Sequence, residues 1–293
     1  MNQEALSLAH SKALAAAGRL RLPFRSKTWK GQSGEFQGGG VGSSMDFQDH
    51  RTYVPGDDPR HINWQAYART GTYTMKLYRE EVRPVVDIAL DVSSSMFFDE
   101  AKATRVAELF YFCVESSYRS GAATHIHLVQ GDVTRAIPVE AVRHHGWFDE
   151  ITRFPQGDPA VAPNLSHLVF QQNAIRVLIS DLLFDLDPDP LLHLMGARQG
   201  FPIILCPHLS SEGEPDWMGN YEFIDVERKT RHQHRVEPSV LKRFKASYIR
   251  HFSLWKQSAQ RHQALFARVA AEADLQSSLS HEAVPVGALE IAH

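Results

Sequence analysis

Short apolar runs alternate with stretches of helical spacing along the chain after residue 84. Residues 85–90, 176–180 and 201–206 are rich in β-branched and apolar side chains and have the length of buried strands. Residues 99–119 carry apolar side chains every three or four positions, which predicts an amphipathic helix. Because alternating strands and helices are typical of α/β proteins, we expect residues 85–293 to form a doubly wound, mostly parallel sheet with helices on both faces.

The same patterns predict further elements of this domain. Residues 123–130 and 133–139 alternate on either side of Gly131-Asp132, which predicts a hairpin. Residues 221–226 predict a fourth apolar strand. Apolar residues recur at spacings of three and four through residues 238–273, which predicts a long helix or a helical pair, and a final strand is expected near residues 275–279.

Residues 1–84 differ in character and are expected to form an appended N-terminal element. Leucines and alanines in residues 3–20 are spaced as in a short helix, which we interpret as a surface helix or a partner-binding arm. The stretch GQSGEFQGGGVGSS, residues 31–44, is so rich in glycine and serine that it predicts a loop. Residues 72–80 alternate as a strand. We therefore expect a helix, a Gly-rich loop and short strands before the α/β domain.

Polar side chains stand directly after two of the predicted buried strands. Asp91, Ser93 and Ser95 occupy alternate positions in LDVSSSM, and Asp181 follows the strand 176–180. Carboxyl ends of parallel strands meet at one edge of an α/β sheet, so we expect both carboxylates to face one crevice. Their oxygens suit one hard cation, Mg²⁺ or else Mn²⁺ or Ca²⁺. The simpler alternative is that a serine of this turn only caps the following helix.

The stretch LDVSSSM resembles the metal-ion-dependent adhesion site (MIDAS) of von Willebrand factor A domains, where the aspartate and both serines of D-x-S-x-S help to hold a divalent cation. The resemblance implies a further loop that supplies a threonine just before a helix. Residues 155–172 contain no threonine, and Pro163 or Asn164 stands in its place, with Asp158 nearby. We therefore expect Asn164 or Asp158 to be a ligand, or this loop to supply none, and the cation to bind weakly.

A second informative block lies in residues 45–84. Its characteristic residues are Arg51, Tyr53, Pro55, Gly56, Asp57, Arg60, Ile62, Trp64, Ala68 and Arg69, and LDVSSSM follows at a fixed distance. Over residues 45–100 this arrangement resembles a bacterial family known as domain of unknown function 58. The resemblance implies that the chain acts with a MoxR-type AAA+ ATPase, in chaperone-like maturation or remodelling of a client protein complex.

The charged residues of this block allow two interpretations. Arginines and aspartates clustered beside a turn, such as Arg51 and Asp57, can form a catalytic site. Arginine also pairs bidentately with carboxylates, and a small element with little core needs such pairs together with aromatic anchors such as Tyr53 and Trp64. We favour the structural interpretation, in which the block fixes the N-terminal segment against the A-type domain.

Composition narrows the classes of function and location. The 293 residues are 43% hydrophobic and carry a formal net charge of −3, which provides no electrostatic footprint for nucleic acid. No apolar run approaches the roughly 20 residues that span a bilayer, and residues 1–22 lack the apolar core of a secretory signal. Cys113 and Cys206 lie in apolar patterns and match no zinc spacing. We therefore expect a cytoplasmic protein.

Two classes of function remain. The leading hypothesis is a non-enzymatic adapter in which an Asp or Glu of a partner protein completes the coordination of the cation. The alternative is a magnesium-dependent phosphohydrolase of the haloacid-dehalogenase type, which also presents an aspartate after a hydrophobic strand. That class uses D-x-D-x-T, and Ser93 stands where the second aspartate would act as acid and base. No lysine follows at a convincing position, so we expect no catalytic residues.

Overall fold

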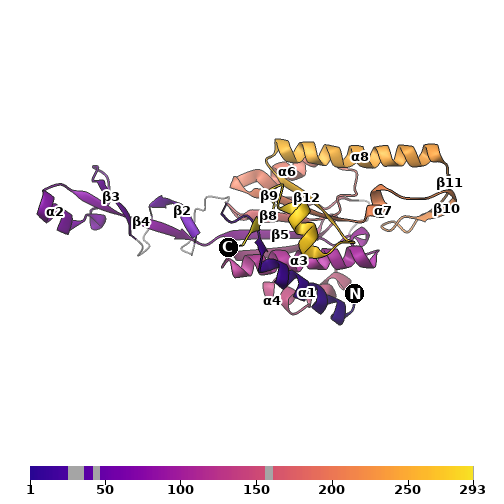
Figure 1. Cartoon of the computed structure of the whole chain (residues 1–293), viewed down its shortest axis with the longest axis horizontal. Helices are drawn as coiled ribbons and strands as arrows, with labels where there is room; N and C mark the ends of the chain where they lie inside the picture. The colour runs from indigo at the N-terminus through magenta and orange to yellow at the C-terminus, as the bar shows by residue number, and fades with distance from the viewer. Residues whose placement is uncertain (26–35, 42–46, 156–160, 293) are drawn as a thin grey trace. The chain divides into compact units, whose positions relative to one another are not determined.

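The computed structural model describes residues 1–25, 36–41, 47–155 and 161–292 (Figure 1). Residues 1–23 and 85–293 form one compact unit, and residues 24–84 form a second. Within the described residues, no helix has both the length and the apolarity needed to cross a bilayer.

A six-stranded sheet forms the centre of the larger unit. Its strands are β5 (Val85–Asp91), β6 (Ala123–Gln130), β7 (Val133–Ile137), β8 (Ile175–Ile179), β9 (Phe201–His208) and β12 (Leu265–Ala270). The order across the sheet is β12-β9-β8-β5-β6-β7, and all neighbours are parallel except β6 and β7. The predicted α/β fold and the hairpin at Gly131-Asp132 are therefore confirmed.

Helices cover both faces of this sheet. Figure 1 shows α3 (Glu100–Arg119) on one side and α6 (Pro188–Gly196) and α8 (Pro238–Arg261) on the other. After β7 the chain forms two short helices, α4 (Val139–Arg143), which packs against α3, and α5 (Trp147–Thr152). Because α3 lies between the sheet and other helices, its side chains are buried on nearly every side.

The N-terminal helix α1 (Gln3–Ala17) belongs to the α/β unit and packs against α3. Leu6, Ala9 and Ala13 are buried, because small side chains let the two helices approach closely. The expected surface helix is therefore present, with one face exposed, but it belongs to the α/β unit and not to the appended N-terminal element in which it was expected. The second unit begins only at Phe24, and its end at Pro84 lies directly before β5.

The C-terminal elements differ from two predictions. Helix α8 ends at Arg261, and Gln263 adopts a left-handed φ of 53°, which a continuing helix does not allow. The apolar residues that follow form edge strand β12, with Ala267 and Val269 buried at a period of two. The expected strand near residues 275–279 is instead a helical turn, α9 (Leu275–Ser278), which continues into η5 (Leu279–Ala283).

The predicted strand at residues 221–226 exists but lies outside the central sheet. It corresponds to β10 (Gly219–Ile224), which pairs antiparallel with β11 (Arg231–Val236) in a separate hairpin. Short α7 (Ser210–Gly213) follows β9, and β1 (Leu20–Arg21) pairs with β13 (Glu290–Ile291).

The smaller unit contains an antiparallel sheet in the order β2-β4-β3, formed by β2 (Phe36–Val41), β3 (Phe47–Thr52) and β4 (Thr74–Val82). Between β3 and β4 lie η1 (Pro59–His61) and α2 (Trp64–Thr70). The expected Gly-rich loop is therefore partly a strand, because backbone pairing needs no side chain. The register of β2 shifts between Gln37 and Val41, where three glycines make an irregularity easy to accommodate.

Candidate metal centre

The carboxyl ends of β5 and β8 bring four predicted ligands to one edge of the sheet. The two strands are neighbours, Asp91 ends β5, and Asp181 follows β8 after one further residue. The Ser93 amide donates to Asp91 Oδ1 at 3.0 Å, and the Ser93 and Ser95 hydroxyls lie 3.1 Å apart. Ser93, Ser95 and Asp181 line one pocket, as the sequence pattern predicts.

Asp91 is a fully buried carboxyl group held from two sides. Besides the Ser93 amide, the Ser180 hydroxyl donates to Asp91 Oδ2 at 2.7 Å. Burial and, to a smaller extent, the nearby negative charge of Asp181 together raise the pKa of Asp91 to about 7, against the opposite effect of these hydrogen bonds. A positive ion at this edge would therefore stabilise the ionised form of Asp91.

Lys102, near the start of α3, binds the second carboxylate of the centre. Its ammonium group has no exposed side-chain surface and lies 2.8 Å from Asp181 Oδ2 and 2.8 Å from Glu212 Oε1. Burial lowers the pKa of Lys102, but the two carboxylates raise it more, so the side chain stays charged. Sequence reasoning missed Lys102, although its place four residues before Val106 puts it on the buried face of the helix.

Glu227 reaches the centre from the turn between β10 and β11. Its carboxylate accepts the Ser95 backbone N–H at 2.6 Å, and it lines the same pocket. Asp225 shapes this turn by accepting the backbone N–H groups of Glu227 and Arg228 at 2.9 Å each. Sequence reasoning missed Glu227 as well, and no local pattern indicates that a turn 132 residues away in the chain meets Ser95.

The pocket has a volume of about 290 Å³, and polar side chains from several loops converge on it. Pro163 contributes to its wall, whereas Asn164 is used elsewhere. Asn164 Oδ1 accepts the Ser166 N–H at 3.0 Å, and its Nδ2 donates to Asp132 at 2.9 Å. The structure therefore does not bring Asn164 together with the other predicted ligands. Asp158 lies outside the described residues.

The oxygen atoms at this edge fit a hard divalent cation that retains several waters. Two carboxylates and two hydroxyls converge here, and the buried Asp91 beside Asp181 favours positive charge. Both oxygens of Asp181 already accept hydrogen bonds, from Lys102 and from the Leu183 amide. Among the described residues, no group of three or more His, Cys, Asp and Glu side chains is arranged to hold a metal. A cation would therefore be held directly by Ser93, Ser95 and water, with the carboxylates of Asp91 and Asp181 beside it as the negative charges that attract it.

The signature block of the smaller unit forms a tight turn fastened by ion pairs. Asp57 accepts two hydrogen bonds from the Arg51 guanidinium, at 2.6 and 2.8 Å, and a third from the Val54 amide. The turn also contains Pro55 and Gly56, whose φ of 109° is one that side chains disfavour. This geometry agrees with a structural role for Arg51 and Asp57.

Most of the remaining signature residues lie on the surface of the smaller unit, whereas Ile62 is buried and forms an antiparallel bridge with Met75. Arg60 pairs with Asp58, and the Tyr53 amide donates to Tyr73 O at 2.9 Å. Trp64 is 58% exposed and touches Tyr67 and Tyr73 only edge-on, so the expected anchoring in a core is not observed. Arg69 is exposed on α2 and forms no ion pair within the described part of the chain.

Comparison with known proteins adds one finding. No curated protein and no solved structure matches the chain. The family described as "Protein of unknown function DUF58" matches residues 49–253, from the signature block through both strand ends of the candidate centre to α8. This match covers more than half of the 293 residues, and the chain therefore belongs to the DUF58 family.

Proposed function

We propose that the chain is a protein–protein interaction adapter of the cytoplasm. Its α/β unit would act as a von Willebrand factor A-like domain that binds a partner through a divalent cation at Asp91, Ser93, Ser95 and Asp181. A MoxR-type AAA+ ATPase is the proposed partner, in chaperone-like maturation or remodelling of a client protein. The family resemblance suggests this partner, and the geometry of the centre supports the mode of binding.

The observation that carries the proposal is the carboxylate of Glu227 against the turn at Ser93 and Ser95. A glutamate from a distant hairpin lies on the Ser95 amide, in the pocket that both serine hydroxyls line. This contact supports the idea that a carboxylate from another segment can enter this pocket. An Asp or Glu of a partner would enter the same pocket, and Glu227 would give way to it.

The residues of the centre would have different roles in binding the partner. When bound, the cation would supply a positive charge to which a partner carboxylate can coordinate. Ser93 and Ser95 would hold it without neutralising it, because hydroxyls carry no charge. Lys102 and Glu212 would keep Asp181 in place, and Ser180 would hold Asp91. Such an arrangement binds and orients a partner, and it requires no proton transfer.

The alternative hypothesis, a phosphohydrolase, requires a direct test. The sequence suggested no lysine for such a site, but the structure places Lys102 at the centre. In the structure Lys102 binds Asp181 and Glu212, while both oxygens of Asp91 accept hydrogen bonds from Ser93 and Ser180. A nucleophilic Asp91 would need an oxygen free to attack phosphorus, and a general acid would have to take the place of Ser93. We therefore favour binding over catalysis.

The experiment measures binding of the purified chain to a MoxR-type ATPase from the same organism, in Mg²⁺ and in EDTA. We expect binding in Mg²⁺, loss in EDTA, and loss in the Ser93→Ala/Ser95→Ala variant. Ser94→Ala is the matched control, because Ser94 belongs to the same turn but does not line the pocket. This control should bind like the unmodified chain.

Two results would contradict the proposal. Equal binding in EDTA and by Ser93→Ala/Ser95→Ala would exclude the cation from the interaction. Magnesium-dependent release of phosphate from a small ester such as p-nitrophenyl phosphate, lost in Asp91→Asn, would replace the adapter with an enzyme.

A further inference from the structure

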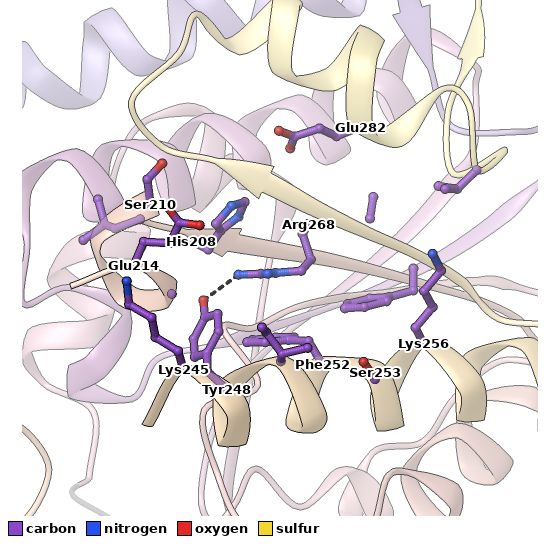
Figure 2. A pocket seen from close by; sticks show the side chains of 16 residues that line it. His208, Ser210, Glu214, Lys245, Tyr248, Phe252, Ser253, Lys256, Arg268 and Glu282 are labelled. Atoms are coloured by element: carbon purple, nitrogen blue, oxygen red, sulfur yellow. Dashed lines mark hydrogen bonds between the residues drawn. The ribbon is translucent and has the colours of Figure 1, made fainter. Parts of the chain in front are cut away.

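A second and larger pocket lies between edge strand β12 and helix α8, away from the candidate metal centre. Figure 2 shows it with Arg268 reaching across from β12 towards Tyr248 and Phe252 of α8. Its volume is about 770 Å³, within the range of sites for small organic ligands. None of its lining residues belongs to the metal centre, so its role is a separate question.

The Arg268 guanidinium is the central polar group of this pocket. Its carbon lies 3.9 Å from the centre of the Phe252 ring, and one of its nitrogens donates to the Tyr248 hydroxyl at 2.6 Å. Stacking and this hydrogen bond hold the planar group in a fixed orientation. Within the described residues, no carboxylate comes within 4.0 Å of it. Arg268 is thus a positioned cation without a direct ion pair among the described residues, and Glu282, which also lines the pocket, lies near enough for its charge to interact with that of Arg268.

In the part of the chain that the structure describes, two polar atoms of the pocket's side chains are buried without a hydrogen-bond partner. They are Arg268 Nε and His208 Nδ1, which come from neighbouring strands. Burial and the nearby Arg268 charge lower the pKa of His208 to about 4, so its ring is neutral near pH 7. Buried polar groups in proteins normally have partners, and an acceptor entering the pocket would supply one.

Charge and apolar surface are combined along the pocket. Lys245 and Lys256 lie at its two ends on α8, roughly 16 Å apart at the helical rise, and neither has a carboxylate partner among the described residues. Two acidic residues, Glu214 and Glu282, also line the pocket, and Glu282 already accepts the Ala270 amide. Phe252, Phe266 and Ile249 provide the apolar surface.

We infer that this pocket binds a small organic anion, a carboxylate carried on a flat apolar body. The carboxylate would accept hydrogen bonds from Arg268, because a guanidinium fork matches the geometry of a carboxylate. The apolar body would lie against the aromatic side chains of α8. The two lysines lie too far apart to share one carboxylate, so their contribution is a positive potential that attracts the anion into the pocket.

The test is isothermal titration calorimetry of the full chain with 2-naphthoate and with its neutral counterpart 2-naphthamide. We expect one site that binds naphthoate about tenfold or more tightly than naphthamide, because only the anion pairs with Arg268. Arg268→Met keeps the apolar stem and should reduce this preference to the smaller part that the lysines supply, while leaving naphthamide binding unchanged. The comparison of the two ligands on the unmodified chain needs no variant, so a folding defect of Arg268→Met leaves the test intact.

A second pair of variants tests the contribution of the lysines. Lys245→Gln/Lys256→Gln should weaken naphthoate binding about twofold to fivefold and reduce its dependence on salt. Lys242→Gln, on the same helix but outside the pocket, should change neither property. Equal affinity for naphthoate and naphthamide, the same preference in a folded Arg268→Met, or no binding of naphthoate at millimolar concentration would each overturn the inference.

Discussion

The same kinds of ion pair occur in the two units of this chain, in very different surroundings. In the α/β unit, Lys102 bridges Asp181 and Glu212 at 2.8 Å and is fully buried. In the smaller unit, Arg60 contacts Asp58 at 2.6 Å, yet its side chain is 86% exposed. The distances are similar, but water screens only the second pair.

The difference in burial distinguishes two roles of ion pairs. The buried Lys102 holds the side chains of the candidate site in place, whereas the exposed pairs of the smaller unit hold local turns. A buried ammonium between two carboxylates fixes Asp181 beside Asp91. The two carboxylates raise the pKa of Lys102, whereas the charge of Asp181 raises the pKa of Asp91 and so disfavours its ionised form. The exposed pairs of the smaller unit close local turns and leave their members accessible to water. The following predictions test the contrast, from the largest expected effect to the smallest.

Lys102→Met should be the most destabilising change. It leaves Asp181 and Glu212 buried without a counterion, which costs about 3–5 kcal/mol in the free energy of unfolding. Chemical denaturation measures this loss, which should shrink at low pH, because burial raises the pKa of Glu212 and protonation then removes its charge. Lys12→Met removes a lysine that pairs with Glu108 from a half-exposed position, and it serves as the control. Equal effects of both variants would refute the contrast.

The titration of Asp91 should make stability depend on pH. Its native pKa of about 7 lies above the ordinary 3.8, so between these values the native state binds more protons than the unfolded state. The stabilising effect is complete below about pH 4 and is lost as the pH rises through 7, by up to about 4 kcal/mol. Denaturation between pH 5 and 8 should show this fall, and Asp91→Asn should flatten it. An unchanged slope in Asp91→Asn would contradict the assignment.

Glu227→Ala should have an intermediate effect. It removes the carboxylate from the Ser95 amide in a partly exposed pocket, which costs about 1 kcal/mol. The matched control is Glu222→Ala in β10, where Glu222 pairs with Arg231 on the exposed side of the same hairpin. Thermal denaturation should show a lower melting temperature for Glu227→Ala and almost no change for Glu222→Ala. A larger loss for Glu222→Ala would show that Glu227 is not the residue that holds the hairpin.

Asp57→Asn should have the smallest effect. The Arg51 guanidinium lowers the pKa of Asp57, but Arg51 is exposed and Asp57 is only partly buried, and asparagine can still accept a hydrogen bond from the Val54 amide. We expect a fall in melting temperature smaller than that for Glu227→Ala, and none in 1 M salt, where exposed charges are screened. If Asp57→Asn lowered the free energy of unfolding as much as Lys102→Met, the Arg51–Asp57 pair would be essential for stability, and the contrast between the two units would be wrong.

The sequence predicts best what periodic patterns determine. The runs that became β5, β8 and β9 are apolar on both faces, and their ends therefore located Asp91 and Asp181 at one edge. Residues 265–270 were harder to assign from the sequence, because Leu265, Phe266 and Val269 fit a helical spacing as well as a strand. Only the pairing with β9 shows that this segment is a strand. Glu227 could not be predicted, since its role depends on where a distant hairpin folds.

Lys102 illustrates a signal that is present but easily misread. A lysine on the buried face of an amphipathic helix usually extends to the surface, whereas here two carboxylates from other segments keep it inside. Asn164 illustrates the opposite case. Its position in the chain suggested a ligand, but a short 3₁₀ turn at residues 165–167 uses its side chain as a cap.

The central claim is that the edge formed by Asp91, Ser93, Ser95 and Asp181 binds one divalent cation. Calorimetric titration of metal-free protein with MgCl₂ at pH 6 and pH 8 tests it most directly. Because the cation requires ionised Asp91, we predict weak binding that is about tenfold tighter at pH 8, and none in Asp91→Asn or Ser93→Ala/Ser95→Ala. Equal binding by the unmodified chain and by Asp91→Asn, or no binding at either pH, would contradict the account.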